Sequence, residues 1–169
     1  GHGISNYCPL AFSAGIRHFS VFSAQEAFFV YQALEGKDFQ LMIMGDVEDG
    51  ALEWVIEKKI ELYVFDQSRL EAAIGVCKKL RLKARIHIEI ETGMNRTGFP
   101  AKDLAGVFQI LKANQAHIEV KGLCSHFAGA ESITNYKRIK DQFNRFKKTE
   151  RTVDDFDWMT PVKHLASSS

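Results

Sequence analysis

Two periods of hydrophobic and polar positions alternate along this chain. Short β-prone runs lie at 19–22, 41–45, 61–65, 85–91, 118–127 and 162–166. Five segments between them place apolar residues three and four positions apart, which is the spacing of an amphipathic helix. The stripe residues are Ala24, Ala27, Phe28, Tyr31 and Leu34; Leu52, Val55, Ile56 and Ile60; Leu70, Ala73, Ile74, Cys77 and Leu80; Leu104, Val107, Phe108 and Leu111; and Tyr136, Ile139, Phe143 and Phe146. Ser23, followed three residues later by Glu26, has the pattern of a helix N-cap.

This alternation predicts βα units, and therefore a parallel sheet with right-handed crossovers. The predicted strands fit either an open doubly wound sheet or an incomplete (β/α)8 barrel. No GxGxxG follows the first strand, so a dinucleotide-binding sheet is disfavoured. The barrel makes the sharper prediction, because functional groups should then lie at the carboxyl ends of the strands.

The run at 85–91 is expected to be a strand with two different faces. Its aliphatic face holds Ile86, Ile88 and Ile90, and its charged face holds Arg85, His87, Glu89 and Glu91. In a parallel sheet covered by helices the charged face is buried too, and buried charges are costly unless they are paired. Such a row therefore indicates a functional interior. The alternative is an edge strand with one face in water.

Polar clusters follow three of the expected strands. They are Met94-Asn95-Arg96 after 85–91, Ser125-His126 at the end of 118–127, and Ser167-Ser168-Ser169 after 162–166. We expect one face of the strand at 118–127 to hold Val120, Gly122, Cys124 and His126, and one face of the strand at 162–166 to hold Val162, His164, Ala166 and Ser168. An arginine, a histidine and a serine on one rim would suit an anionic, ring-shaped ligand such as a phosphorylated cofactor.

Composition excludes several classes of protein. The chain has 169 residues, 46% of them hydrophobic, which is enough for one domain with a sizeable core. A net charge of +1 gives no field that would attract nucleic acid or an acidic membrane surface. No apolar run approaches the roughly 20 residues that span a bilayer, and no signal peptide is visible. We therefore expect a cytoplasmic protein that binds neither nucleic acid nor membrane.

Cysteine and histidine usage adds little chemistry. Cys8, Cys77 and Cys124 are far apart and form no CxxC pair, so reduced thiols are expected. The six histidines form no HxH or HExxH pattern, and we expect no metal site.

The polar clusters also carry a resemblance to a known family. Segment 91–99 reads ETGMNRTGF and closely resembles the DTGMxRxGF of alanine racemases. Segment 122–131, GLCSHFAGAE, is similar to that family's G(L/I)xTHFAxAD. Segment 164–168, HLASS, is similar to HxANS, and residues 1–3, GHG, to the end of KAxAYGHG. The matches occur in the family's order from one end of the chain to the other.

This resemblance implies a pyridoxal-5′-phosphate (PLP) enzyme that interconverts L- and D-alanine for bacterial peptidoglycan synthesis. The family has a barrel N-terminal domain, a β-rich C-terminal domain and an active site completed in a homodimer. Residues 1–169 would be part of the PLP-binding barrel domain, with about strands two to seven of eight. The cofactor in such enzymes is held by a lysine and acts as an electron sink.

Carried over by position, three residues would contact the cofactor. Arg96 would lie near the cofactor's phenolic oxygen and the substrate carboxylate. His126 would stack on the pyridine ring, and Ser168 would donate to the phosphate. The plain alternatives are a surface loop arginine, a core histidine and a frayed terminus.

The sequence departs from the family pattern in three respects. Many members have a carbamylated lysine where Glu89 stands, so we expect the Glu89 carboxylate to orient Arg96 directly. Ser167 replaces a usual asparagine. The Schiff-base lysine, the tyrosine base of the partner and the C-terminal domain have no counterpart in the sequence, so we expect a part of a longer protein that is inactive alone.

Other functions remain open at this point. Serine racemisation is a close variant, and an amino-acid decarboxylase or D-amino-acid aldolase of the same barrel class is a second. A non-catalytic PLP- or phosphate-binding barrel domain is an alternative outside enzymology. The TGMNRTG segment at 92–98 favours the racemase.

Overall fold

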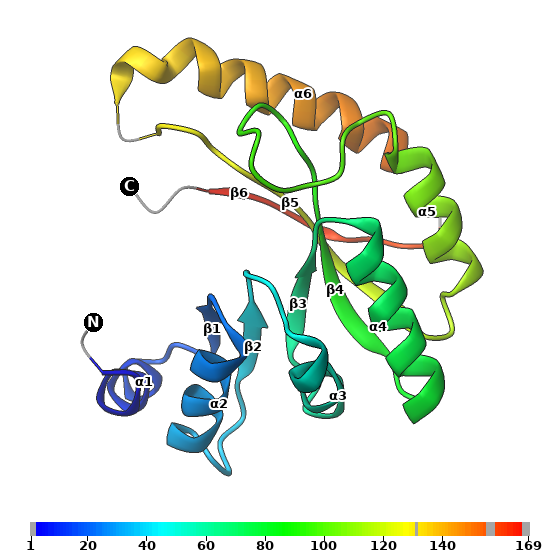
Figure 1. Ribbon diagram of the computed structural model, residues 1–169. Coiled ribbons are helices and arrows are strands. Elements are labelled where there is room, and N and C mark those ends of the chain that lie inside the picture. The colour runs from blue at the N-terminus through cyan, green and yellow to red at the C-terminus, as the bar shows by residue number, and fades with distance from the viewer. Residues whose placement is uncertain (1–2, 131, 155–157, 167–169) are drawn as a thin grey trace.

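The computed structural model describes residues 3–130, 132–154 and 158–166, which form one curled parallel sheet with helices outside it (Figure 1). The strands are β1 (His18–Val21), β2 (Gln40–Ile43), β3 (Glu61–Val64), β4 (Ala84–Glu89), β5 (Ile118–His126) and β6 (Val162–Ala166). They lie in the order β1-β2-β3-β4-β5-β6, and each pairs in parallel with the next. This half-barrel confirms the predicted incomplete (β/α)8 fold.

Helices follow the strands along the outer face of the sheet (Figure 1). They are α1 (Ile4–Ser13), α2 (Ala24–Ala33), α3 (Asp49–Glu57), α4 (Gln67–Leu80), α5 (Leu104–Ala113), the 3-10 turn η1 (Ile133–Asn135) and α6 (Tyr136–Asp154). The predicted N-cap of α2 is confirmed, because Ser23 Oγ accepts from the Glu26 amide and Glu26 reaches back to the Ser23 amide. Among the described residues, no helix is both long and apolar enough to cross a bilayer.

The two faces of β4 lie in different surroundings, as the sequence predicted. Ile86, Ile88 and Ile90 pack into the core between the sheet and the helices. His87 and Glu89, each 5% exposed, point to the inner face of the curl. Because β4 lies between β3 and β5, the alternative of a wet edge strand is wrong.

The predicted face of β5 needs one correction. The pairing of β4 with β5 shifts after Ile86↔Val120, so that His87 faces Gly122 and Lys121 is the extra residue. Val120 consequently packs in the outer core with Ile86, while Gly122 and Cys124 lie across from the polar residues of β4. A bulge of this kind exchanges faces within one strand, and strict alternation does not predict it.

The predicted stripe of α6 is wrong in part. Phe146 is buried, but Tyr136 is 66% and Phe143 40% exposed. The buried face of this helix instead holds Gln142 and Thr149 beside Phe146. This face meets the polar ends of two strands as well as the core, in which Phe146 packs, and Gln142 satisfies backbone groups at those ends.

Candidate active site

The loop that follows β4 is held in shape by its own first residues. The Glu91 carboxylate accepts from the Gly93 amide and, at 2.8 Å, from the Asn95 amide. Phe99 closes the base of the loop, since its carbonyl accepts from the Glu91 amide at 3.0 Å and its amide donates to the Glu89 carbonyl at 2.8 Å. Arg96 lies at the exposed end of the loop that these contacts fix.

Gln142 of α6 joins this loop to the end of β5. Its side-chain amide donates to Thr92 Oγ1 at 3.3 Å and to the His126 carbonyl at 2.9 Å, and its oxygen accepts from the Ala128 amide at 2.9 Å. Gln142 is 1% exposed. One buried side chain therefore fixes the position of the Arg96 loop relative to the His126 loop.

Further hydrogen bonds attach the same loop to its neighbours. Arg145 Nη1 donates to the Thr92 carbonyl at 2.9 Å, and Arg138 Nη2 donates to the Gly93 carbonyl at 3.2 Å. From β5, Ser125 Oγ donates to the Ile90 carbonyl at 2.8 Å. The loop is consequently held from both the strand side and the helix side.

Glu89 is a buried carboxylate within the electrostatic influence of Arg96. Burial raises the pKa of the Glu89 carboxyl, while a hydrogen bond from Thr97 and the positive charge of Arg96 act in the opposite direction. Arg96 therefore lies close enough to stabilise the ionised form of Glu89. The converse effect, in which Glu89 orients Arg96, stays a prediction.

His126 ends β5 as a half-buried imidazole. Burial lowers its pKa, and the charge of Arg96 lowers the pKa further, so the ring is neutral near neutral pH. The structure thus brings two of the predicted residues, Arg96 and His126, into electrostatic reach of each other at the carboxyl end of the sheet. The third, Ser168, lies outside the described residues.

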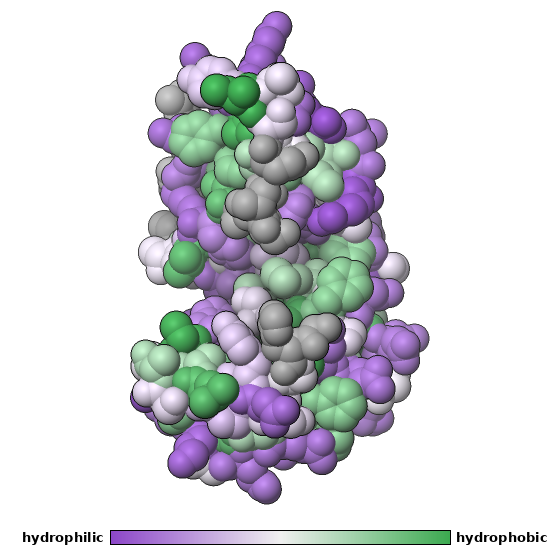
Figure 2. Space-filling model, turned by 90° about the vertical axis from the view of Figure 1, so that its left-hand side faces the viewer, coloured by the Kyte–Doolittle hydropathy of each residue, from purple (hydrophilic) through white to green (hydrophobic). Residues whose placement is uncertain are grey.

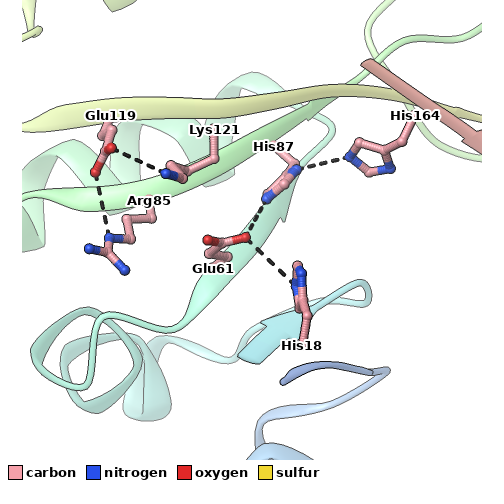
Figure 3. Close-up of polar contacts among 7 residues, drawn as sticks. All are labelled: His18, Glu61, Arg85, His87, Glu119, Lys121 and His164. Carbon is pink, nitrogen blue, oxygen red and sulfur yellow. Dashed lines mark hydrogen bonds and ion pairs between the residues drawn. The ribbon is translucent and has the colours of Figure 1, made fainter. Parts of the chain in front are cut away.

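Below this rim the inner face holds further polar residues, among which Glu61 was not identified from the sequence (Figure 3). Glu61, His87 and His164 form a hydrogen-bonded series across the sheet. Tyr63 and Cys124 also lie on this face, and burial raises the pKa values of both groups. Glu61 and Tyr63 alternate with Leu62 and Val64 in the β3 run. That alternation was the sequence signal that could have placed Glu61 and Tyr63 on the inner face.

The residues that link the loops gave no such signal. Gln142 contacts backbone groups at positions 126 and 128 and the side chain of Thr92, all distant in the sequence, and no local pattern marks that role.

The open side of the half-barrel, turned toward the viewer in Figure 2, carries separate apolar patches among polar side chains. Exposed apolar residues also occur on α1, with Tyr7 and Leu10, and on the edge strand β6, with Val162.

Known proteins share both the sequence and this arrangement. The family model of the alanine racemase N-terminal domain matches residues 1–169. The alanine racemase of Clostridium tetani is 28% identical over 171 positions, which cover 100% of this chain and 43% of that protein. Alanine racemase 2 of Oceanobacillus iheyensis is 33% identical over 149 positions, which cover 88% of this chain and 37% of that protein.

Solved structures agree. The alanine racemase of D-cycloserine-producing Streptomyces lavendulae superposes with a TM-score of 0.89 at 25% identity, over 98% of this chain and 43% of that one. The alanine racemase of Clostridium difficile 630 gives a TM-score of 0.85 at 26% identity, over 99% and 43%. The chain spans less than half the length of these relatives. The chain belongs to the alanine racemase family, because residues 1–169 match the model of that family's N-terminal domain.

Proposed function

We propose that the protein containing this chain is a PLP-dependent alanine racemase that interconverts L- and D-alanine. The observation that carries the proposal is the placement of Arg96 and His126 on two loops that Gln142 joins at the carboxyl end of the sheet, where barrel enzymes hold their substrates. The family match over the whole chain supports the same reaction.

The residues at this rim fit PLP, which combines a flat pyridine ring with anionic oxygens. His126 offers a neutral, half-buried imidazole, a flat surface on which an aromatic ring can stack. Arg96 offers a guanidinium with five fixed donors, which suit a phenolic oxygen or a carboxylate. When bound, the cofactor supplies an electron sink for the carbanion formed at the α-carbon. Ser168 is the proposed phosphate donor.

Arg96 and Glu89 would then each hold a charged group in place. Arg96 would bind the substrate carboxylate, and its loop is held by Glu91, Phe99 and Gln142. Glu89 would hold the guanidinium through its buried carboxylate. Because the raised pKa of Glu89 reflects burial, its ionised form depends on Arg96 and Thr97.

The assembly and cellular role follow from the same proposal. We propose a homodimer in the cytoplasm whose D-alanine serves cell-wall peptidoglycan. The relatives are more than twice as long as this chain, so the lysine that holds the cofactor and the second base would come from other parts of the protein and of its partner.

The test is made on the full-length protein. Retention of PLP through gel filtration, together with PLP-dependent formation of D-alanine from L-alanine, would support the proposal. Arg96→Ala should abolish turnover, and Arg81→Ala, at the exposed end of α4, serves as the control. Release of CO2 from the amino acid would indicate a decarboxylase instead. PLP retention without any turnover would favour the non-catalytic binding domain.

A further inference from the structure

Glu61, His87 and His164 form a continuous hydrogen-bonded series on three strands of the inner face (Figure 3). His87 Nε2 lies 2.8 Å from Glu61 Oε2, and His87 Nδ1 lies 2.9 Å from His164 Nε2. Glu61 is 4% and His87 5% exposed. The proposed roles of Arg96 and His126 use none of these three side chains.

The geometry fixes where the protons lie when both imidazoles are neutral. Burial alone would raise the pKa of the Glu61 carboxyl, but the hydrogen bond and charge of His87, with the charges of His18 and Lys121, lower it on balance. An ionised carboxylate only accepts, so His87 must carry its proton on Nε2. Its Nδ1 is then a bare acceptor, and His164 Nε2 must donate. His164 Nδ1 is consequently an acceptor.

One added proton reverses this polarity. An imidazolium at His87 donates from both nitrogens, to Glu61 on one side and to His164 on the other. His164 Nε2 then accepts, and a neutral His164 carries its proton on Nδ1. Burial, together with the charge of His87, lowers the pKa of His164 to about 4, so the added proton does not reside on His164.

We propose that Glu61, acting through His87, sets the tautomer of His164 and thereby whether its Nδ1 accepts or donates. The register Glu89↔Cys124↔His164 places His164 level with Glu89, which lies within the electrostatic influence of Arg96. His164 would thus present a defined polarity next to the proposed site. That consequence for catalysis rests on the proposed function, whereas the tautomer itself does not.

The surroundings of the series favour a fixed arrangement. The titratable and charged groups that face it are His18 of β1, Tyr63 of β3, Glu89 of β4, and Lys121 and Cys124 of β5. His18 Nε2 lies 4.0 Å from Glu61 Oε2, close enough to support the ionised carboxylate. Gly122 leaves the space that the two imidazoles occupy, since a Cβ there would lie 2.2 Å from His87 Nδ1.

The test is the nitrogen-15 NMR spectrum of the histidines in the full-length protein, which distinguishes the two tautomers of each ring. At about pH 8, where imidazoles are neutral, we expect protons on Nε2 of both His87 and His164. A proton on His164 Nδ1 at alkaline pH would overturn the proposal, with no variant needed.

Glu61→Gln removes the charge and keeps the size of the side chain. Because an amide can donate as well as accept, His87 no longer has to carry its proton on Nε2, and a second tautomer of His164 should appear at about pH 8. Glu53→Gln, at an exposed carboxylate of α3 that pairs with Lys79, is the control and should leave the tautomer of His164 unchanged. A single, unchanged His164 tautomer in Glu61→Gln would contradict the inference. These spectra report on the tautomer even in a protein that fails to racemise alanine.

Discussion

The imidazole of His87 occupies the space that a side chain on Gly122 would need. A Cβ built on Gly122 would lie 2.2 Å from His87 Nδ1 and 3.0 Å from His164 Nε2. Gly122 has no positive φ, so the backbone alone would accept alanine. The glycine is therefore required by packing, because it lets two imidazoles from β4 and β6 meet across the bulged strand β5, which lies between them.

Gly122→Ala should accordingly destabilise the protein. Displacing the ring of His87 from a packed interior costs roughly 1–3 kcal/mol in the free energy of unfolding. Gly75→Ala in α4 is the matched control, because nothing lies within 4 Å of the added methyl group. An alanine inside a helix should stabilise by about 0.5–1 kcal/mol. Urea unfolding of both variants measures the difference, and equal midpoints would contradict the packing argument.

The capping box of α2 gives a second prediction. Ser23→Ala removes the acceptor for the Glu26 amide, which lies 3.2 Å from Ser23 Oγ, and should lower the free energy of unfolding by about 1 kcal/mol. Ser13→Ala at the end of α1 is a control, since that exposed hydroxyl only donates to the Leu10 carbonyl. Chemical denaturation of the two variants should show the larger loss for Ser23→Ala.

Features of the fold that follow a local sequence period could be predicted from the sequence. Strand and helix alternation predicted a parallel sheet, and the family resemblance selected the barrel. The alternation at 85–91 predicted both faces of β4. Two features could not be predicted from the sequence, because they depend on residues that are distant along the chain. The bulge at Lys121 moved Val120 to the outer core, and Gln142 is buried by backbone groups at positions 126 and 128.

The residues of the candidate site also divide into those that the sequence identified and those that it did not. Arg96 and His126 were identified by a resemblance to motifs, and the fold brings them to one rim. Glu61 was not identified, because a carboxylate in a strand becomes meaningful only when its partner, His87, is known to face it from the next strand. Cross-strand pairs of this kind depend on register, which local sequence does not encode.

Acid should destabilise the fold through His164. Its pKa is lowered from 6.5 to about 4, chiefly by burial. A depressed pKa contributes stability that is present above pH 6.5 and is lost as the pH falls through about 4. The lowered pKa of Glu61 also makes the fold less stable as the pH falls, and this loss begins below pH 4.5. We expect unfolding free energies to fall between pH 6.5 and 4, and to fall less steeply in His164→Gln.

The contribution of Glu89 to stability depends on pH in the opposite direction. Its raised pKa means that the protonated form suits the fold, so its contribution is present below pH 4.5 and is lost as the pH rises through the raised value. Glu89→Gln, which mimics the protonated form, should therefore be at least as stable as the wild type at neutral pH. A marked loss of stability in this variant at pH 7 would show that the ionised carboxylate supports the fold.

The same substitution should impair the proposed racemase. The amide side chain in Glu89→Gln would keep an oxygen that can accept from Thr97 but would lose the charge that acts on Arg96, so Arg96 would be held less firmly. Loss of a charge-assisted contact should lower kcat/KM for alanine by about tenfold in the full-length enzyme. Because an amide cannot ionise, the acidic limb of the pH–rate profile should also change. Glu119→Gln removes a carboxylate paired with Arg85 at 3.5 Å and should leave both readouts unchanged. Unaltered kinetics in Glu89→Gln would mean that Arg96 is positioned by its loop alone, through Glu91 and Phe99.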